Sequence, residues 1–163
     1  MHRRLQSILL AAALSFGLVI FHHPAGSSPN HKGFHCTLTY KGQLVLAKAT
    51  FMPNEDETEM HYMLEVQNLE DITMAHVHLG MMHHLSTPVV WLYPASPPPK
   101  LVPGRFTGVL ADGTITAKNL VGSLRGHPLS DLIEEMRAGR AHVNVHTKRH
   151  PEGSICGEVR LME

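Results

Sequence analysis

The sequence has no excess of charge of either sign. Its lysine and arginine residues number 14, and so do its aspartate and glutamate residues. Proteins that bind nucleic acid usually carry an excess of positive charge, so this balance gives no reason to expect a nucleic-acid partner. The chain also lacks a G-x-S-x-G motif, a glycine-rich phosphate loop and a Cys/His protease pattern. Nucleophilic catalysis therefore has little support from the residues.

Cysteine is scarce as well, with only Cys36 and Cys156 in 163 residues. In an exported chain such a pair can form a disulfide, which here would link the first predicted strand to the last. Strand alternation opposes this pairing, because Cys156 falls on a polar side with Glu158 whereas Cys36 shares a side with Leu38. The two residues are a candidate disulfide that the sequence alone does not decide.

The one long hydrophobic run lies at the N-terminus and is typical of a targeting segment. It covers residues 5–21, follows two arginines and precedes a polar, turn-rich stretch. This order is the pattern of a secretory signal peptide. We expect a signal peptide over residues 1–26, a linker over 27–33 and one domain over 34–163, in a protein that is secreted or held in the cell envelope. An uncleaved membrane anchor is the alternative, because about 17 to 25 apolar residues can span a bilayer.

After the linker, the chain reads as a series of short strands separated by turns. Hydrophobic and polar residues alternate over 60–67, as in a strand with one buried face. The acidic stretch 53–58 precedes it and is expected to form a hairpin turn. The proline-rich stretch 95–104 is expected to be a loop, because proline lacks the amide donor that a central strand needs. Ala-Asp-Gly at 111–113 predicts a turn between two further strands.

One helix is predicted near residues 129–138. Leu129, Leu132, Ile133 and Met136 recur there at helical spacing, and a glycine follows. Many short strands with a single small helix predict an all-β fold, an antiparallel sandwich or barrel.

Histidine is abundant, with 14 residues, and two groups of histidines stand at strand spacing. His76 and His78 are two residues apart. In the second group, His142, Asn144 and His146 occupy alternate positions. Because alternate residues of a strand share a face, each stretch presents polar rings on one face and apolar side chains on the other. If the two strands are neighbours, their imidazoles converge.

Converging imidazoles favour a metal site. Imidazole is the commonest metal ligand near neutral pH, and three imidazoles with an open position suit copper or zinc. We therefore predict a surface site built from His76, His78 and His146, with His142 as an additional candidate ligand. Asn144 is expected to form hydrogen bonds rather than to contact the metal. The alternative is that these histidines are ordinary surface or hydrogen-bonding residues.

Several segments, taken in order, resemble the CHRD domain, which is named for chordin and is widespread in exported microbial proteins. They are AHVHLG, PVVWLYP, the stretch from GTITAKNL to AHVNVHT, and PEGSICGEV. The resemblance covers residues 34–163, and its most specific part is VNVHT followed by P-x-G and G-E. Two positions depart from the common pattern, since His142 stands where tyrosine is usual and Cys156 where arginine or a similar residue is usual.

CHRD domains in turn resemble Cu/Zn superoxide dismutases. This likeness implies a Greek-key antiparallel β-sandwich, immunoglobulin-like or superoxide dismutase-like, with the short helix near 129–138. It also implies that His76, His78 and His146 match copper ligands. The match is incomplete, because no zinc-binding cluster is evident and Gly153 stands where those enzymes have an active-site arginine.

Three functions remain open at this point. The first is an exported metal-binding domain that handles a metal ion or uses one to brace its strands. The second is a copper-dependent enzyme like superoxide dismutase. The third is a metal-free extracellular module for protein interaction, for which Trp91 and Tyr93 are candidate surface residues.

Overall fold

A computed structural model describes residues 32–40, 44–80, 87–153 and 155–163, and these form an all-β fold with one short α-helix. The predicted fold class is thereby confirmed. The predicted signal peptide lies outside the described residues. The strands are β1 (Phe34–Tyr40), β2 (Leu44–Pro53), β3 (Glu59–Leu79), β4 (Pro88–Tyr93), β5 (Val102–Thr116), β6 (Ala141–Thr147) and β7 (Ile155–Leu161). The helices are the 3-10 turns η1 (Ala117–Asn119) and η2 (Gly122–Leu124), and α1 (Leu129–Arg137). Among the described residues, no helix is both long and apolar enough to cross a bilayer.

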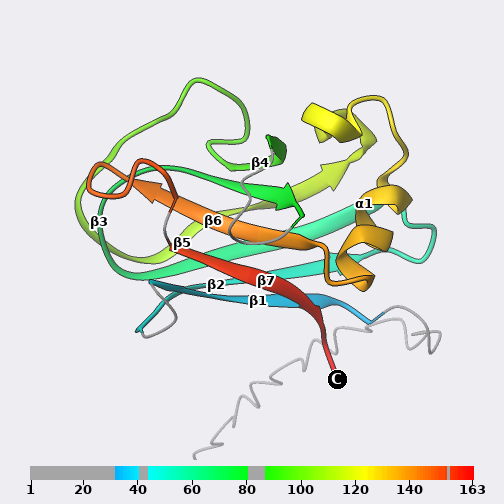
Figure 1. The fold of residues 1–163 in the computed structure, drawn as a ribbon, viewed down its shortest axis with the longest axis horizontal. Coiled ribbons are helices and arrows are strands. Elements are labelled where there is room, and N and C mark those ends of the chain that lie inside the picture. The colour runs from blue at the N-terminus through cyan, green and yellow to red at the C-terminus, as the bar shows by residue number, and fades with distance from the viewer. Residues whose placement is uncertain (1–31, 41–43, 81–86, 154) are drawn as a thin grey trace, which may run out of the picture.

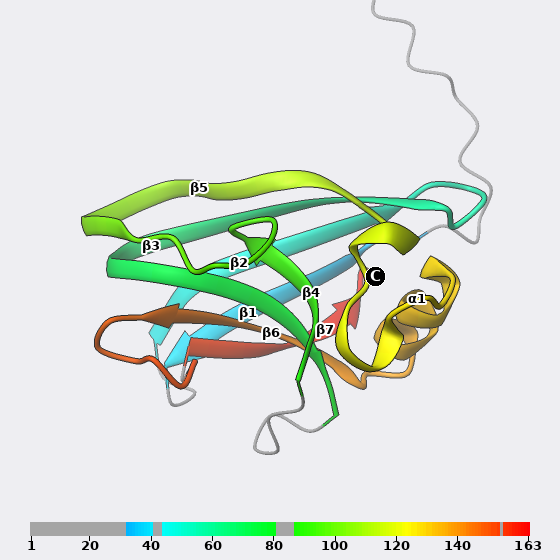
Figure 2. The ribbon, with the colours of Figure 1, turned by 90° about the horizontal axis from the view of Figure 1, so that it is seen from above.

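The strands form one antiparallel sheet that folds over into two layers (Figure 2). Their order is β2-β1-β7-β6-β3-β4, and two further pairings join β2 and β5 to β3. The first part of β3 pairs with β2 and β5, and its last part pairs with β4 and β6. Between the two parts, Asn68 and Asp71 adopt positive φ angles of 57° and 52°, which asparagine and aspartate tolerate better than most residues. By bending there, β3 closes the sheet into a barrel-like sandwich.

The core lies between the two layers. It is made by the inward face of each strand and by the apolar side of α1, whose Leu129, Leu132, Ile133 and Met136 are all buried. The helix lies at one end of the sandwich, between β5 and β6 in the chain (Figure 1). The Tyr62 hydroxyl joins the layers by donating a hydrogen bond to the Leu92 carbonyl at 2.9 Å. The burial of each large side chain stabilises the fold by about 1.5–3 kcal/mol.

The predicted elements near the site are mostly confirmed. The helix is observed at Leu129–Arg137, within one residue of the predicted end. The acidic stretch after β2 does form the hairpin turn, in which the Asn54 side chain accepts hydrogen bonds from the Thr58 and Glu59 amides. The stretches 60–67 and 74–79, which read separately in the sequence, belong to the single strand β3.

The turn predicted at 111–113 is wrong. Strand β5 runs through these residues without reversing, and Asp112 and Gly113 pair with Met63 and Tyr62 of β3. The long β3 offers a partner for each residue, so tertiary pairing overrides the local turn signal. A Cβ on Gly113 would lie 3.3 Å from the Tyr62 ring. The glycine therefore serves a close approach to that ring rather than a turn.

The candidate disulfide between Cys36 and Cys156 is not formed, and both residues are free thiols. Although β1 and β7 are neighbours, Cys36 is opposite Val159 and Cys156 is opposite Thr39. Cys36 lies in the core at 2% exposure, whereas Cys156 is on the other face of the sheet. The alternation of the two strands therefore keeps the sulfurs apart. Burial raises the pKa of the Cys36 thiol to about 12.

We expect the unfolding midpoint of the protein to be the same with and without a reducing agent. A bridge that closed so long a loop would contribute about 2–4 kcal/mol and would be lost on reduction. Intact mass and thiol titration in denaturant check the same point, with two reactive thiols expected. A reductant-dependent fall in the midpoint, or a mass lower by two hydrogens, would contradict the structure.

Candidate metal centre

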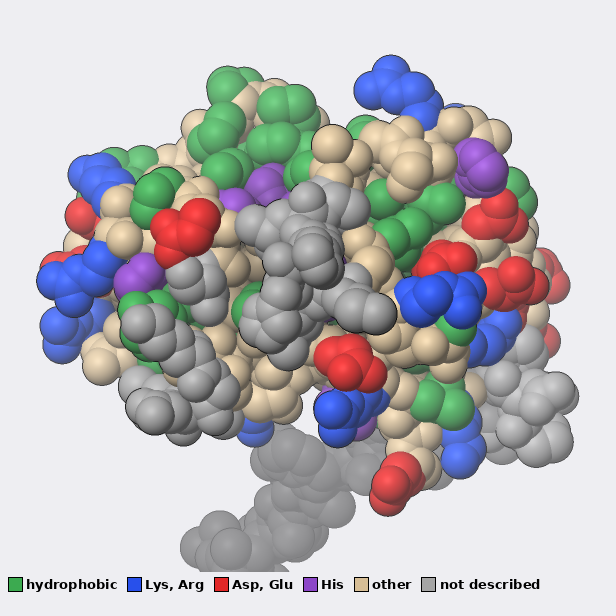
Figure 3. Space-filling model, in the orientation of Figure 1, with side chains coloured by type: hydrophobic (Ala, Val, Ile, Leu, Met, Phe, Trp, Pro, Cys, Tyr) green, Lys and Arg blue, Asp and Glu red, His purple; other side chains and the backbone are tan. Residues whose placement is uncertain are grey.

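The two histidine strands are neighbours, as the site prediction requires. The last part of β3 pairs with β6, which sets His76 opposite Asn144, His78 opposite His142 and Met74 opposite His146. Val77 and Val143 point into the core from the same strands, so the polar residues share the outer face of this layer. The layer of β6 and β7 faces the viewer in Figure 1, and histidine side chains are visible on that face in Figure 3.

Three of the four predicted ligands come together. One nitrogen from each of His76, His78 and His146 forms a group in which all three atoms lie within 4.8 Å of one another. The closest measured pair is His76 Nδ1 and His146 Nε2, at 3.3 Å. The His76 ring stands edge-on to both other rings, with centroids 5.7 Å from His78 and 5.1 Å from His146. We call these three residues the histidine trio.

The trio is buried, so the prediction of a surface site is wrong. His76, His78 and His146 are only 2%, 4% and 7% exposed. The turn after β6 covers part of this face, because the Pro151 carbonyl accepts a 2.8 Å hydrogen bond from His146 Nδ1. The pairing rules place the histidines outside the core, but they do not show which loops fold over that face.

Gly153 completes this cover and has a conformation that suits glycine. Its φ is +79°, and a Cβ there would lie 2.5 Å from Asn144 Nδ2 and 3.0 Å from His146 Nε2. Any side chain at this position would therefore enter the space beside the ligand nitrogen of His146. In the sequence, Gly153 stands out only because superoxide dismutases have an arginine at this position. Its place beside His146 is set by the geometry of the turn.

Hydrogen bonds from outside the trio fix which nitrogen carries the proton. Because His146 Nδ1 donates to a carbonyl, Nε2 carries the lone pair of the neutral ring. His78 Nε2 donates to the Asn144 Oδ1 at 3.2 Å, so in that ring Nδ1 carries the lone pair. Asn144 therefore has the hydrogen-bonding role that the sequence predicts. Such partners orient metal-binding histidines in known sites.

His142 does not join the trio. Its ring stacks on His78 at a centroid distance of 5.3 Å and an interplanar angle of 14°, and it is 1% exposed. Neither of its ring nitrogens has a hydrogen-bond partner among the described residues. In this arrangement His142 supports the His78 ring through stacking and is not placed as a ligand.

Unpartnered polar atoms are concentrated at this site. In the part of the chain that the structure describes, four buried side-chain nitrogens lack a hydrogen-bond partner, and all belong to His76, His142 and Asn144. Each such group costs about 1–3 kcal/mol when nothing compensates it. A fold that keeps several of them together on the paired strands β3 and β6 is expected to use them.

Trp91 forms another wall of the site, which sequence reasoning did not foresee. It lies opposite His76 on the β4 side, and its ring contacts the His76 ring edge-on with a centroid distance of 4.3 Å. From the sequence, Trp91 is a candidate surface residue of an interaction module. The pairing of β3 with β4 places it beside the trio instead, and no local sequence signal indicates that pairing.

Burial lowers the pKa of three histidines of this site, His76, His142 and His146, and so favours their neutral form. Burial, followed by the nearby rings of His146 and His78, lowers the pKa of His76 from 6.5 to about 3. Burial and then the charge of His78 lower the pKa of His142 to about 4. Burial also lowers the pKa of His146, although its bond to the Pro151 carbonyl opposes this. Neutral rings offer the lone pairs that a metal ion needs.

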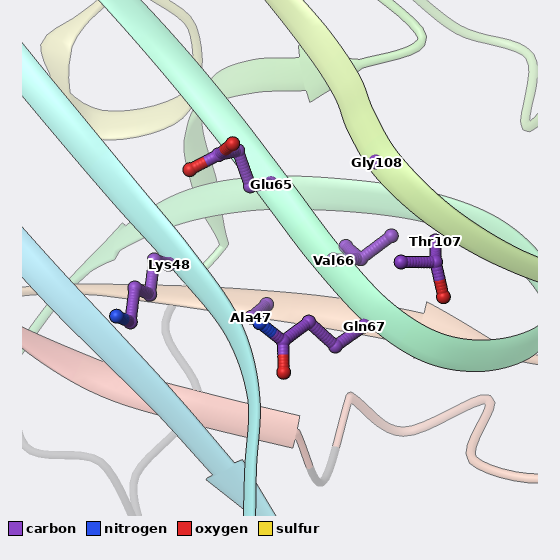
Figure 4. Close-up of a pocket in the computed structure, with 7 residues that line it drawn as sticks. All are labelled: Ala47, Lys48, Glu65, Val66, Gln67, Thr107 and Gly108. Atoms are coloured by element: carbon purple, nitrogen blue, oxygen red, sulfur yellow. The ribbon is translucent and has the colours of Figure 1, made fainter.

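Two of the surface hollows among the described residues lie away from the trio. The first, of about 170 Å³, lies between β2, β3 and β5, and its lining includes Lys48 and Glu65, which are opposite each other in the register of β2 and β3. Figure 4 shows its lining residues, which are Ala47, Lys48, Glu65, Val66, Gln67, Thr107 and Gly108. The second, of about 700 Å³, is bordered by Thr147 and His150 of the turn that covers His146.

We expect the metal-free protein to lose stability as the pH falls below 6.5. The unfolded chain binds protons at His76 and His142 in the range between pH 6.5 and about 4, whereas the folded chain does not. The free energy of unfolding should fall by roughly 1 kcal/mol per pH unit for each such histidine. Urea unfolding of chelator-treated protein at several pH values measures this. His142→Phe should reduce the slope, and the exposed control His61→Gln should not; equal slopes in all three proteins would contradict the assignment.

The comparisons with known proteins identify a family and nothing closer. No curated protein and no solved structure matched the chain. A family model, the CHRD domain, matches residues 35–159, a range that contains β2 to β6, most of β1 and β7, and the trio. It covers most of the chain and agrees with the resemblance read from the sequence segments. The chain belongs to the CHRD domain family.

Proposed function

We propose that this protein is an exported metal-binding module that holds one copper or zinc ion on His76, His78 and His146. The single observation that carries the proposal is the buried trio, in which three ligand nitrogens lie within 4.8 Å of one another. Three neutral imidazoles that converge from two paired strands form a donor set suited to these metals.

The spacing of the nitrogens supports the proposal. Bonds of about 2.0–2.1 Å from a metal to two imidazoles, at tetrahedral or trigonal angles, separate the two nitrogens by about 3.3–3.6 Å. His76 Nδ1 and His146 Nε2 are 3.3 Å apart. Without a metal, the same distance corresponds to a long hydrogen bond from His76 Nδ1 to the His146 lone pair. His76 Nε2 is buried with no partner in either case, so the support comes from the distance itself.

The burial of the trio favours metal holding over superoxide dismutation. A dismutase must admit its substrate to the metal at each turnover, and the three ligands here are at most 7% exposed. A buried ion would instead be carried by the protein or would brace β3 against β6. The resemblance to superoxide dismutase was not accompanied by a matching solved structure.

Export is part of the proposal and is supported by the sequence of the N-terminus. Two arginines followed by the apolar run at 5–21 are the pattern of a secretory signal. Outside the cytoplasm, a buried all-histidine site has the advantage that its ligands are not oxidised, in contrast to cysteine ligands.

The ligand assignment is tested by measuring metal content. After loading with copper or zinc and desalting, the untagged protein should retain about one equivalent of metal, and His76→Ala or His146→Ala should retain less than roughly a tenth of that. Mass spectrometry of the metal gives the count. The exposed His61→Ala is the control and should retain metal like the wild type. Normal retention by both trio variants would contradict the site.

Gly153→Ala should weaken metal binding by roughly tenfold or more. The reason is that the added methyl group would lie 3.0 Å from His146 Nε2, the nitrogen proposed to bind the metal. Competition with a metal-binding dye measures the affinity. Gly126→Ala is a matched control, since Gly126 has a similar φ of +83° with nothing within 4 Å of its Cβ position. Both variants carry the same backbone strain, so an equal loss in the two would show that strain, and not the site, is responsible.

A further inference from the structure

The metal site has no buried negative charge near it. All 14 aspartate and glutamate residues of the chain lie within the described residues, and none of them is buried. The buried polar residues of the described chain are five neutral groups of the site and its surroundings, plus one threonine. No carboxylate or thiolate therefore joins the trio among the described residues.

The carboxylate that acts most directly on the trio is Glu152. Its negative charge raises the pKa of His146. This effect is smaller than the lowering by burial and smaller than the raising by the hydrogen bond to Pro151. The Glu152 side chain is 56% exposed and lies 3.6 Å from His150. Water screens a carboxylate in such a position, so it compensates little of the charge of a buried ion.

This lack of counter-charge discriminates between ions. The free energy needed to move an ion from water into a low-dielectric interior rises with the square of its charge. Neutral imidazoles leave the whole charge of the ion in place. A divalent ion in the trio would therefore carry an uncompensated double charge, whereas a monovalent ion would carry only a single one.

The number of ligands points the same way. Zinc sites in proteins are almost always four-coordinate, but the described residues supply three nitrogens, so zinc would need water or another group as its fourth ligand. The space beside His146 Nε2 is small, because even a single Cβ at Gly153 would lie 3.0 Å from that nitrogen. Three-coordinate binding by neutral donors suits a cuprous ion, which is softer than zinc and has no need of a fourth ligand.

Trp91 adds a soft, electron-rich neighbour. Its ring lies 4.3 Å from the His76 ring, at 82° to it. An aromatic ring beside a cation stabilises positive charge without adding a formal negative charge. Trp91 is the only tryptophan of the chain, so its fluorescence also reports on events at His76.

We propose that the trio is a site for monovalent copper, Cu(I), in preference to Cu(II) and Zn(II). This inference rests on the proposed metal-binding function and specifies its ion. The preference for Cu(I) follows from three features that lie together: three imidazole ligands, a tryptophan ring beside one of them, and the absence of any buried carboxylate among the described residues.

The experiment compares ions on the full untagged protein. Under anaerobic conditions, Cu(I) affinity is measured by competition with a chromophoric cuprous chelator, and Zn(II) and Cu(II) affinities by competition with dyes for those ions. We expect about one equivalent of Cu(I), quenching of Trp91 fluorescence that saturates at the same ratio, and a higher affinity for Cu(I) than for Zn(II) or Cu(II).

Two variants make the charge argument specific. Asn144→Asp places a carboxylate beside His78 without a change of size, and it should raise Zn(II) affinity relative to Cu(I) by about tenfold or more. Trp91→Leu should weaken Cu(I) binding by about three- to thirtyfold, because it removes the electron-rich ring beside His76. If Asn144→Asp does not fold, Trp91→Leu and the wild-type comparison still test the proposal.

Three results would overturn it. Retention of Zn(II) or Cu(II) with no preference for Cu(I) would reject the choice of ion while leaving the metal site in place. A loss of binding in Glu152→Gln would show that a carboxylate does supply the counter-charge, and would also reject it. Failure of the wild type to retain any of the three ions would reject the metal-binding function itself.

Discussion

The site depends on one constraint, the register between the last part of β3 and β6. This register sets His76 opposite Asn144 and brings His146 within 3.3 Å of His76. A slip of one residue would turn every side chain of one strand to the other face and would drive the histidines into the core. The apolar residues between them, such as Val77 and Val143, hold the register because only one face of each strand suits the core.

The polar face is buried without being part of the hydrophobic core. Strand β6 is buried along its whole length, on one side by the core and on the other by the turn that carries Pro151 and Gly153. Imidazoles enclosed in this way stay neutral, and several of their nitrogens lack partners. The fold tolerates that cost because its core is large and its sheet is closed through the pairing of β2 with β3.

Membership of the CHRD family and the geometry of the trio lead to a consistent view of the molecule. The barrel-like sandwich is a rigid support, and the short turn after β6 is the part that encloses the site. Because the chain has no buried acid, the chemistry of the site is set by neutral donors and an aromatic neighbour. The ion that we propose for this site would therefore be held through softness and geometry rather than through charge.

The sequence by itself determined the all-β class, the helix near Leu129–Arg137 and the identity of the three converging histidines. These depend on local periodicity, which is fixed by the two- and 3.6-residue repeats of the backbone. Only the tertiary structure decided that the site is buried, that Trp91 and Gly153 line it, that β5 runs straight through residues 111–113, and that the two cysteines stay apart. Each of these depends on which distant strands pair and in which register, and the residues of one strand carry no signal for that.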